Sequence, residues 1–359
     1  MAGGQRRLTT LRARLRGGGL EALLVTHGPN ILYLVNFHGS AGVLVVTRRG
    51  AVLFTDGRYA AQARAEVRVA RVVATQGSLL GAAAGWLREA RARRIGFEAA
   101  RVTADGYAQL RRALGGSSRL LAVRNLVEDM RAVKDTDEIA ALGRAARLGS
   151  RVFAEVLPLV RPGVRELDLA AEIEYRMKRA GAAGAAFETI VASGRRSALP
   201  HARASRKRLA RNELVVFDLG AILSDYCSDM TRTVFLGRPS ARLRRLYACV
   251  REAQQRGFEA VQAGVAAQRV DAAVRGVLRA HRLDRYFIHG TGHGVGLEIH
   301  EEPRLARSVN TRLVAGHVVT LEPGVYIPGW GGIRIEDLVV VRRGGAERLT
   351  PTPHDLITL

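Results

Sequence analysis

Short apolar runs alternate with stretches of helical periodicity over the first third of the chain. Four runs have the length and the branched side chains of buried strands, at residues 22–26, 42–47, 51–56 and 94–98. Between them lie alanine-rich stretches such as AAAGWLREARAR, in which apolar residues recur at the spacing of a helix. This alternation predicts a mixed α/β domain built around a buried sheet.

The pattern changes after about residue 115. Amphipathic helices are predicted from about Asp135, at 167–181, at 243–261 and at 267–281. Apolar runs typical of strands occur at 214–220, 230–237, 317–324 and 332–341. We therefore predict an α+β chain, with a smaller α/β domain over 1–127 and a larger domain over 128–359.

Composition supports a globular chain, and its charge raises the question of a polyanion partner. Of the 359 residues, 47% are hydrophobic, enough for a core in each of two domains. The formal net charge of +23 is typical of nucleic-acid-binding proteins. The basic residues are nearly all arginines spread along helical segments, however, and the dense run at 203–211 has no aromatic residue for base stacking. We predict no nucleic acid partner.

The chain lacks the signals of a membrane or disulfide-bonded protein. No apolar stretch approaches the roughly 18 residues of a membrane span, and the basic N-terminus is not followed by the apolar segment of a signal peptide. We expect a cytoplasmic protein without a membrane partner. Cys227 and Cys249 have no CxxC spacing, so we expect reduced thiols and no thiolate zinc site.

Four acidic residues interrupt apolar strand runs in the larger domain. The segment 214–235 predicts a hairpin in which Asp218 closes the first strand and Asp229 opens the second, although either residue alone is an ordinary turn former. Glu322 directly follows an apolar run, and Glu336 lies within another. Buried carboxylates are costly unless cations neutralise them. Two divalent cations balance the four negative charges.

The segment GTGHGVGLEIHE, at 290–301, surrounds histidine with glycine. His293 lies between Gly292 and Gly294, which lets its imidazole approach a metal while the backbone crowds a neighbouring strand, where any Cβ would collide. A histidine beside four strand-borne carboxylates is best interpreted as a ligand. We predict that His293 is the imidazole ligand of the metal site.

The predicted site suits metal-assisted hydrolysis. Two oxygen-rich metal sites roughly 3.5–4 Å apart lower the pKa of water and polarise a carbonyl. The excess of carboxylates favours manganese, with cobalt, iron or zinc as alternatives, and the lack of cysteines excludes an all-thiolate zinc site. Departure of an amine also needs a proton donor, and His201, His289 and His300 are candidates. Arg334, two residues before Glu336, can hold a carboxylate.

Four segments together resemble a known family. They are VVFDLGAILSDYCSDMTRT, GTGHGVGLEIHE, TLEPGVY and GIRIEDLVV. In this order they resemble the pita-bread metallopeptidases, and within them the branch of prolidases and aminopeptidases P. MRAVKDTDEI is similar to that branch's entry helix, and NILYLVNFHGSAGVLVV and TDGRYAAQA are similar to its creatinase-type domain. The resemblance implies a pita-bread catalytic domain after a smaller creatinase-like one, and a homodimer.

The resemblance also implies how the metal ligands divide between two ions. Asp218 would chelate one ion, and Asp229 and Glu336 would bridge both. His293 and Glu322 would complete the second ion. His317 stands where the family usually has methionine, and since this is a packing position we interpret it as a core or supporting residue and not as a sixth ligand.

The remaining roles concern the substrate. The resemblance implies that His201 and His300 orient the substrate and stabilise the tetrahedral intermediate, and that Glu322 receives the proton of the attacking water. His289 would lie near the scissile bond, and Arg334 goes with Xaa-Pro specificity.

The leading hypothesis is therefore a dinuclear exopeptidase that attacks Xaa-Pro bonds of small peptides with a metal-bridged hydroxide. The short length and the GIRIED context favour a dipeptidase over an aminopeptidase P. Two alternatives stay open: a non-catalytic pita-bread module that binds proteins, and a metal-independent amidinohydrolase similar to creatinase. Metal content distinguishes them, because only the peptidase needs two ions.

Overall fold

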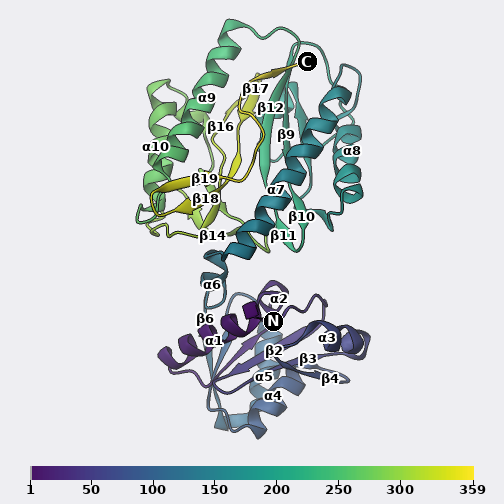
Figure 1. Cartoon of the computed structure of the whole chain (residues 1–359), viewed down its shortest axis with the longest axis vertical. Coiled ribbons are helices and arrows are strands. Elements are labelled where there is room, and N and C mark those ends of the chain that lie inside the picture. The colour runs from purple at the N-terminus through teal and green to yellow at the C-terminus, as the bar shows by residue number, and fades with distance from the viewer. Residues whose placement is uncertain (1) are drawn as a thin grey trace. The chain divides into compact units, whose positions relative to one another are not determined.

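The computed structural model describes residues 2–359, apart from the side chains of Ala2 and Ser117. The chain forms two compact units, Met1–Arg131 and Ala132–Leu359. Figure 1 shows helices and strands mixed in both units, as the α+β prediction requires. Within residues 2–359, no helix combines the length and the apolar character needed to cross a membrane.

The N-terminal unit is built on one six-stranded mixed sheet. In sheet order the strands are β4 (Arg71–Ala74), β3 (Ala51–Thr55), β2 (Gly42–Thr47), β1 (Ala22–Val25), β5 (Arg94–Glu98) and β6 (Arg119–Val123). The helices are α1 (Ala2–Gly17), α2 (Gly28–Val35), α3 (Ala60–Glu66), α4 (Leu79–Glu89), α5 (Ala104–Leu114) and α6 (Glu128–Ala132), which reaches the unit boundary. Leu87 of α4 and Leu110 of α5 pack with Leu24 and Val45 of the sheet. The predicted α/β domain with a buried sheet is confirmed.

Two strands of this sheet were not predicted. β4 and β6 lie at its two edges, and their side chains are only partly buried. Each contains only a short apolar run, VVA in β4 and LLAV in β6, and so short a run does not distinguish a strand from a helix segment by its pattern. The four predicted runs are the four central strands.

Two pairs of helices flank the strands of the C-terminal unit, one pair on each side (Figure 1). The first pair is α7 (Thr136–Val156) and α8 (Glu166–Arg179), and the second is α9 (Ala241–Ala260) and α10 (Ala267–Ala280). α7 begins at Asp135, whose carboxylate accepts from the backbone N–H of Glu138 while the Glu138 carboxylate accepts from that of Asp135. This capping box fixes the start of the helix where the sequence predicted it.

The strands between the helices form four sheets. The first contains β20 (Ile357–Thr358), β12 (Met230–Leu236), β9 (Glu213–Leu219) and β8 (Ile190–Ser193). The second contains β14 (Glu301–Leu305), β13 (Gly292–Gly294), β15 (Val318–Leu321), β18 (Asp337–Arg342) and β19 (Gly345–Arg348). The smaller sheets are β11 (Tyr226–Cys227), β10 (Ala221–Leu223) and β7 (Gly184–Ala185), and β16 (Gly324–Ile327) with β17 (Gly331–Arg334).

Each helix pair has its own apolar core. Phe153 of α7 and Ile173 of α8 pack with Phe217 of β9. On the other side, Val274 of α10 packs with Ile333 of β17. The strands are thereby covered by helices from both sides, and the strand ends between the two cores carry the polar residues.

Two local predictions need correction. β9 and β12 pair antiparallel, with Asp218 opposite Thr231, but their connection is not a simple turn, because it contains the β10–β11 hairpin. The predicted strand 332–341 is two strands, β17 and β18, which belong to different sheets. The chain must leave one sheet for the other, and Glu336 lies in the break between them.

Candidate metal centre

The five predicted metal ligands lie at strand ends or on a short strand. Asp218 is the second-last residue of β9, and Asp229 directly precedes β12. His293 is the central residue of β13, Glu322 directly follows β15, and Glu336 directly precedes β18. Strand pairing brings these positions to one region. β9 pairs with β12 in one sheet, and in the other sheet β15 pairs with both β13 and β18.

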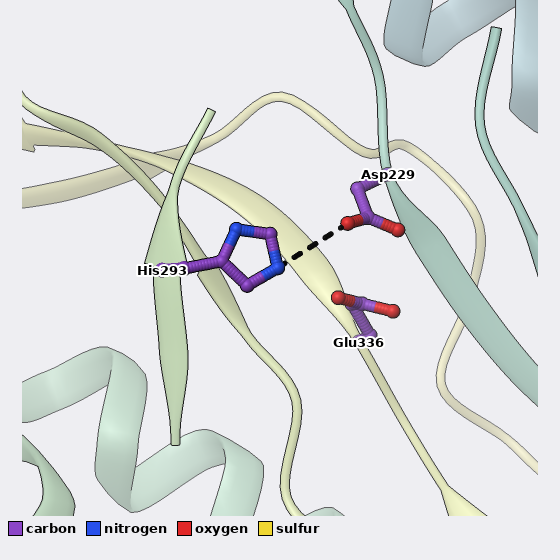
Figure 2. A group of neighbouring side chains, drawn as sticks. All are labelled: Asp229, His293 and Glu336. Atoms are coloured by element: carbon purple, nitrogen blue, oxygen red, sulfur yellow. Dashed lines mark ion pairs between the residues drawn. The ribbon is translucent and has the colours of Figure 1, made fainter. Parts of the chain in front are cut away.

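Three of the five form a compact group with donor atoms facing one another. One donor atom each from Asp229, His293 and Glu336 lies within 4.8 Å of the others. Figure 2 shows the His293 ring directed at both carboxylates, with Nε2 of His293 3.6 Å from Oδ2 of Asp229. The same nitrogen lies 3.7 Å from Oε1 of Glu322. These separations leave room for an ion between the donors.

The electrostatics of the group indicate missing positive charge. Burial raises the pKa of Asp229 well above its ordinary value, and repulsion from Glu336, Asp218 and Glu322 adds to it. Burial and the neighbouring Glu322 and Asp218 do the same to Glu336. Burial also raises the pKa of Asp218, and that of Glu322 to about 7. Nearby cations would stabilise the ionised forms of all four carboxyl groups.

Two further observations fit a divalent cation. Oδ1 of Asp218 is buried and has no hydrogen-bond partner among the described residues, so one carboxylate oxygen is available as a ligand. Burial lowers the pKa of His293 to about 4, which keeps its imidazole neutral, as metal coordination requires. Oxygen donors with one imidazole are suited to manganese, iron, cobalt or zinc.

The glycines beside His293 have the predicted function. A Cβ on Gly292 would lie 2.0 Å from the carbonyl oxygen of Thr320, and one on Gly294 would lie 2.3 Å from that of Glu302. Side chains at these positions would therefore collide with the backbones of both neighbouring strands. The glycines let β13 fit between β14 and β15 while His293 points at the carboxylates.

One cavity of about 630 Å³ joins the group to the other predicted residues. Nine sequence-predicted site residues line it: His201, Asp218, Asp229, His289, His293, His300, Glu322, Arg334 and Glu336. The ring of His300 lies 4.4 Å from that of His293, and His201 lies on an exposed loop. His317 is not among the residues that line the cavity; its Nδ1 accepts from the backbone N–H of Val314.

Arg334 is bound tightly within the protein. Its Nη2 donates to Oδ2 of Asp218 at 2.6 Å, its Nη1 to the Tyr326 hydroxyl at 2.7 Å, and its Nε to Thr231 Oγ1 at 2.9 Å. The Thr231 hydroxyl donates in turn to Glu336 at 2.6 Å. Arg334 therefore orients two of the predicted ligands, in addition to lining the cavity.

His289 is held as a neutral ring. Its Nδ1 donates to the carbonyl of Gly290, and its Nε2 accepts from the hydroxyl of Tyr326, which itself accepts from Arg334. Burial, and then Arg334, lower the pKa of His289 to about 4. Sequence reasoning missed Tyr326, although its position in the TLEPGVY segment was a signal for it.

Arg203 and Arg304 also line the cavity and were not predicted as site residues. Arg304 follows His300 by four residues, and Arg203 follows His201 by two. Arg203 forms an ion pair at 2.9 Å with Glu188, which lines the cavity as well. Proximity to the predicted histidines was the available signal, but it was obscured by the abundance of arginine along the whole chain.

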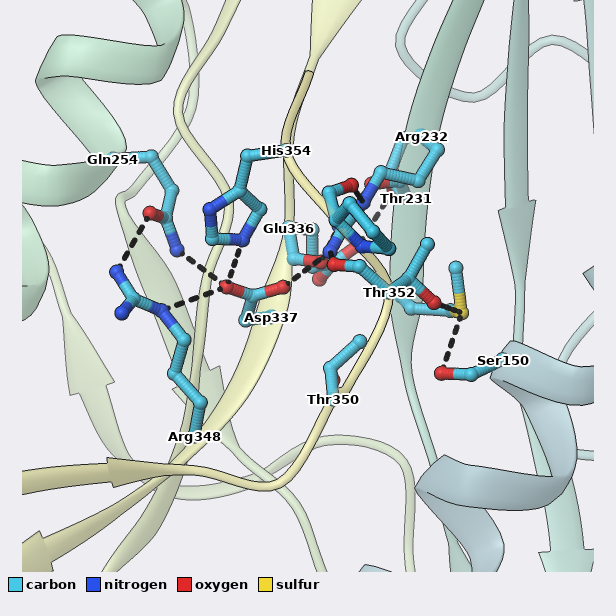
Figure 3. A network of polar contacts seen from close by, with 12 residues as sticks. Ser150, Thr231, Arg232, Gln254, Glu336, Asp337, Arg348, Thr350, Thr352 and His354 are labelled. Atoms are coloured by element: carbon cyan, nitrogen blue, oxygen red, sulfur yellow. Dashed lines mark hydrogen bonds and ion pairs between the residues drawn. The ribbon is translucent and has the colours of Figure 1, made fainter. Parts of the chain in front are cut away.

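A second charged cluster surrounds Asp337, the chain neighbour of Glu336 (Figure 3). Asp337, adjacent to Glu336, is fully buried, and its Oδ1 accepts from Arg232 Nη2 at 2.7 Å. Its Oδ2 accepts from Gln254 at 2.8 Å, His354 at 2.6 Å and Arg348 at 3.2 Å. Burial acts to raise the pKa of Asp337, but the charge of Arg232 and the hydrogen bond from His354 hold this pKa below its ordinary value.

Arg232 connects this cluster to the metal group. Its Nη1 donates to the carbonyl of Glu336 at 2.6 Å, and its other nitrogens donate to the carbonyls of Thr352 and Pro353. The backbone on which Glu336 is presented is therefore fixed from behind by a buried guanidinium.

Comparison with known proteins agrees with this geometry. Residues 140–343 match metallopeptidase family M24, and residues 7–133 match the creatinase/prolidase N-terminal domain. The chain is 44% identical over 235 residues to the Xaa-Pro dipeptidase of Pyrococcus furiosus, covering 66% of this chain and 68% of that protein. The predicted resemblance and the predicted two-domain fold are confirmed.

Solved structures show the same arrangement over nearly the whole chain. The chain is similar to a Xaa-Pro dipeptidase from Bacillus anthracis, with a TM-score of 0.96 and 38% identity over 99% of this chain and 100% of that one. It is also similar to an X-Pro aminopeptidase from Thermotoga maritima, with a TM-score of 0.90 and 34% identity over 95% of this chain and 98% of that one.

Proposed function

The chain belongs to metallopeptidase family M24, and we propose that it is a peptidase that hydrolyses the bond between a residue and the proline that follows it. The observation that carries the proposal is the group of Asp229, His293 and Glu336, with Asp218 and Glu322 beside it, at the wall of one cavity. The resemblance to Xaa-Pro dipeptidases and an X-Pro aminopeptidase supports the substrate class.

We propose two divalent ions, with manganese favoured. Two ions balance the four carboxylates, whose raised pKa values indicate that protein cations do not compensate them fully. When bound, the ions supply a Lewis acid for the scissile carbonyl and lower the pKa of the attacking water. Asp218 would hold one ion, His293 and Glu322 the other, and Asp229 and Glu336 both.

The remaining residues act on the substrate and its protons. Glu322 accepts the proton of the attacking water. His300, whose ring lies against that of His293, and His201, on its exposed loop, orient the substrate and stabilise the oxygen that becomes negative. His289, neutral and fixed by Tyr326, lies near the scissile bond. Arg334 acts in Xaa-Pro recognition through its hold on Asp218 and on Tyr326.

We favour a dipeptidase over an enzyme that trims long peptides. Arg203 and Arg304 bring two guanidinium groups to the cavity, and a guanidinium binds a free carboxylate with two parallel hydrogen bonds. In a dipeptide that carboxylate belongs to the proline itself. The similarity to the X-Pro aminopeptidase of Thermotoga maritima keeps the longer substrate as the second candidate.

Metal depletion and restoration test the proposal. The purified protein is stripped with a chelator, its metal content is determined by elemental analysis, and manganese is added back. Hydrolysis of Gly-Pro, Leu-Pro and a longer Xaa-Pro-Pro peptide is measured at each stage. We expect about two ions per chain and recovery on the dipeptides. Recovery only on the longer peptide would support the aminopeptidase, and full activity without metal would contradict the proposal.

Other expectations from the sequence are proposals of the same kind. We propose that the enzyme acts in the cytoplasm as a homodimer, without a nucleic acid partner, and that its domains are 1–127 and 128–359. Light scattering during size-exclusion chromatography tests the dimer. A non-catalytic binding module and a metal-independent amidinohydrolase remain the alternatives, and both require activity or binding that survives chelation.

A further inference from the structure

The loop that carries His201 connects β8 to β9 and has an unusual anchor. The chain leaves β8 at Ser193, passes through a short helical turn at Gly194–Ala198, and reaches His201 before Ser205. The side chain of His201 is exposed at the cavity. Its position therefore depends on how the backbone of the segment 193–205 is held, both beside His201 and at the two ends of the segment.

Both ends are held by one carboxylate. Glu166, the first residue of α8, is fully buried. Its Oε1 accepts from the backbone N–H and from the hydroxyl of Ser193, each at 2.8 Å. Its Oε2 accepts from the backbone N–H of Ser205 at 3.1 Å and from the Ser205 hydroxyl at 2.6 Å. The start and the end of the loop therefore meet at the two oxygens of Glu166.

Arg196 closes the same loop across its middle. Its Nε donates to Oε2 of Glu166 at 3.0 Å, and its Nη2 donates to the carbonyl of Arg203 at 2.5 Å. Burial acts to raise the pKa of Glu166. This pKa is nevertheless below its ordinary value, because Ser205 and Ser193 donate hydrogen bonds to the carboxylate and Arg196 adds positive charge. The carboxylate is therefore ionised at neutral pH, and its hydrogen bonds are charge-assisted and strong.

The tip of the loop lies against the metal centre. The hydroxyl of Ser197 accepts from the backbone N–H of Gly332 in β17 at 2.8 Å. Arg334, which also binds Asp218, donates to the carbonyl of Pro200 at 3.1 Å. Pro200 is the neighbour of His201 in the chain. A displacement of the loop ends would therefore move His201 relative to the metal ligands.

We propose that Glu166 is a positioning residue for His201, because it joins both ends of the loop that presents this histidine to the cavity. The inference rests on the proposed peptidase function and on the role of His201 in it. Glu166 lines no part of the cavity and acts only through the loop.

The substitution Glu166→Gln tests this with little change of shape. The amide nitrogen of glutamine cannot accept a hydrogen bond, so one end of the loop loses its acceptor. We expect kcat on a Xaa-Pro dipeptide to fall by about 10- to 100-fold, with KM changed less than kcat and with metal content unchanged. Glu172→Gln is the matched control on the same helix, because the ion pair of Glu172 among the described residues is with the partly exposed Arg176, and Glu172 does not line the cavity. We expect unchanged activity.

A double-mutant cycle separates positioning from general stability. In a His201→Ala background, Glu166→Gln should cause little further loss of kcat, because the residue through which it acts is gone. If the two losses multiply, the proposal is wrong. Should Glu166→Gln fold poorly, Ser205→Ala removes one hydroxyl donor at one end and takes its place in the cycle.

Hydrogen exchange gives a readout that does not depend on activity. In Glu166→Gln, the amides of residues 194–204 should exchange faster, while those of α7 stay protected. Unchanged exchange in 194–204 would overturn the proposal even if activity falls. By contrast, a wild-type protein inactive on every Xaa-Pro substrate, with its metal bound, would contradict the proposed function and leave the exchange result as the test of the loop anchor.

Discussion

Glu336 and Asp337 are adjacent, both buried, and electrostatically opposite. Glu336 faces Asp229 and His293, and its pKa is raised well above the ordinary value by burial and by the neighbouring carboxylates. Asp337 is at least as buried, yet its pKa lies below the ordinary value because Arg232 and His354 neutralise it. Burial is common to both residues, so the difference lies in the charge that surrounds them.

This contrast distinguishes a structural carboxylate, Asp337, from a proposed metal ligand, Glu336. Around Asp337 the protein supplies its own cations, and every oxygen has a donor. Around Glu336 the guanidinium that lowers its pKa, that of Arg334, is shared with Asp218, while Arg232 is paired with Asp337 and reaches only the Glu336 carbonyl. The carboxylates of Glu322 and Asp218 add negative charge. A buried charge without a partner is tolerated only if something else neutralises it. We propose that bound divalent ions supply this neutralisation at the metal site.

The largest expected effect on activity comes from removing the charge of Glu336, which the protein's own cations do not fully compensate. Glu336→Gln should lower kcat/KM on Xaa-Pro dipeptides by about 1000-fold or more, as the loss of a central catalytic group does. The metal-free variant should nevertheless be more stable to urea than the metal-free wild type, because one repulsive carboxylate is gone. A variant that keeps its metal content and activity would contradict the assignment of Glu336 as a ligand.

The corresponding amide substitution at Asp337, whose charge the protein compensates, should lower the free energy of unfolding. Asp337→Asn leaves Arg232 buried without its anionic partner, and breaking a buried pair in this way costs about 3–5 kcal/mol. The free energy of unfolding in urea is the measurement, with and without metal. If Asp337→Asn is as stable as the wild type, the cluster around Asp337 does not hold the fold as described.

The pH dependence of stability should differ between metal-free and metal-loaded protein. In the metal-free protein the pKa of Glu322 rises from its ordinary value of 4.5 to about 7. The folded state then binds more protons than the unfolded state between these values, so the free energy of unfolding falls as pH rises through this range. Asp337 acts in the opposite direction, since its lowered pKa adds stability that is lost as pH falls through the folded value.

Urea unfolding between about pH 2 and 8, with chelator or with manganese, measures both effects, because the Asp337 contribution is lost only below its ordinary pKa of 3.8. Manganese should abolish the decrease in the free energy of unfolding that Glu322 causes as pH rises towards 7. It should not change the decrease that protonation of Asp337 causes at acid pH. If the free energy of unfolding of the chelated protein does not fall between pH 4.5 and 7 relative to the metal-loaded protein, the carboxylates at the metal site are not uncompensated as described.

The smallest effect is expected at the exposed end of the same strand. Arg342 of β18 pairs with Glu347 of β19 at 2.5 Å, and both side chains are about half exposed. Glu347→Gln should change the free energy of unfolding by less than about 1 kcal/mol and should not alter kcat/KM. A larger loss would mean that charge pairing along β18 matters regardless of burial.

The central elements of the fold could be predicted from the sequence. The strands 42–47 and 94–98 were predicted with their observed bounds, and the helix predicted at 167–181 is α8, Glu166–Arg179. Central strands and amphipathic helices bury continuous or periodic apolar runs, which leave a clear pattern. β4 and β6 were missed because their apolar runs are short, and the β10–β11 hairpin was missed because a pairing of two residues leaves no pattern in the sequence.

The residues that line the candidate site were predicted from the sequence, but the residues that hold them in place were not. The ligand-type residues stand in recognisable local contexts, and all nine predicted residues line one cavity. Their roles stay predictions until they are measured. Glu166 lies 27 residues before Ser193 and 39 before Ser205, so no local pattern relates them. Tyr326 and Thr231 matter only because the strands that carry them are folded against Arg334.

The two glycines beside His293 also set limits on how this protein can diversify. Because a methyl group at either position would enter a neighbouring carbonyl oxygen, neither can vary without moving a whole strand. Substitutions are therefore excluded beside His293 and tolerated at the margin of the cavity, where Arg203 is exposed on a loop. New substrate preferences within such a lineage should arise from that loop, while the metal-facing strands are inherited unchanged.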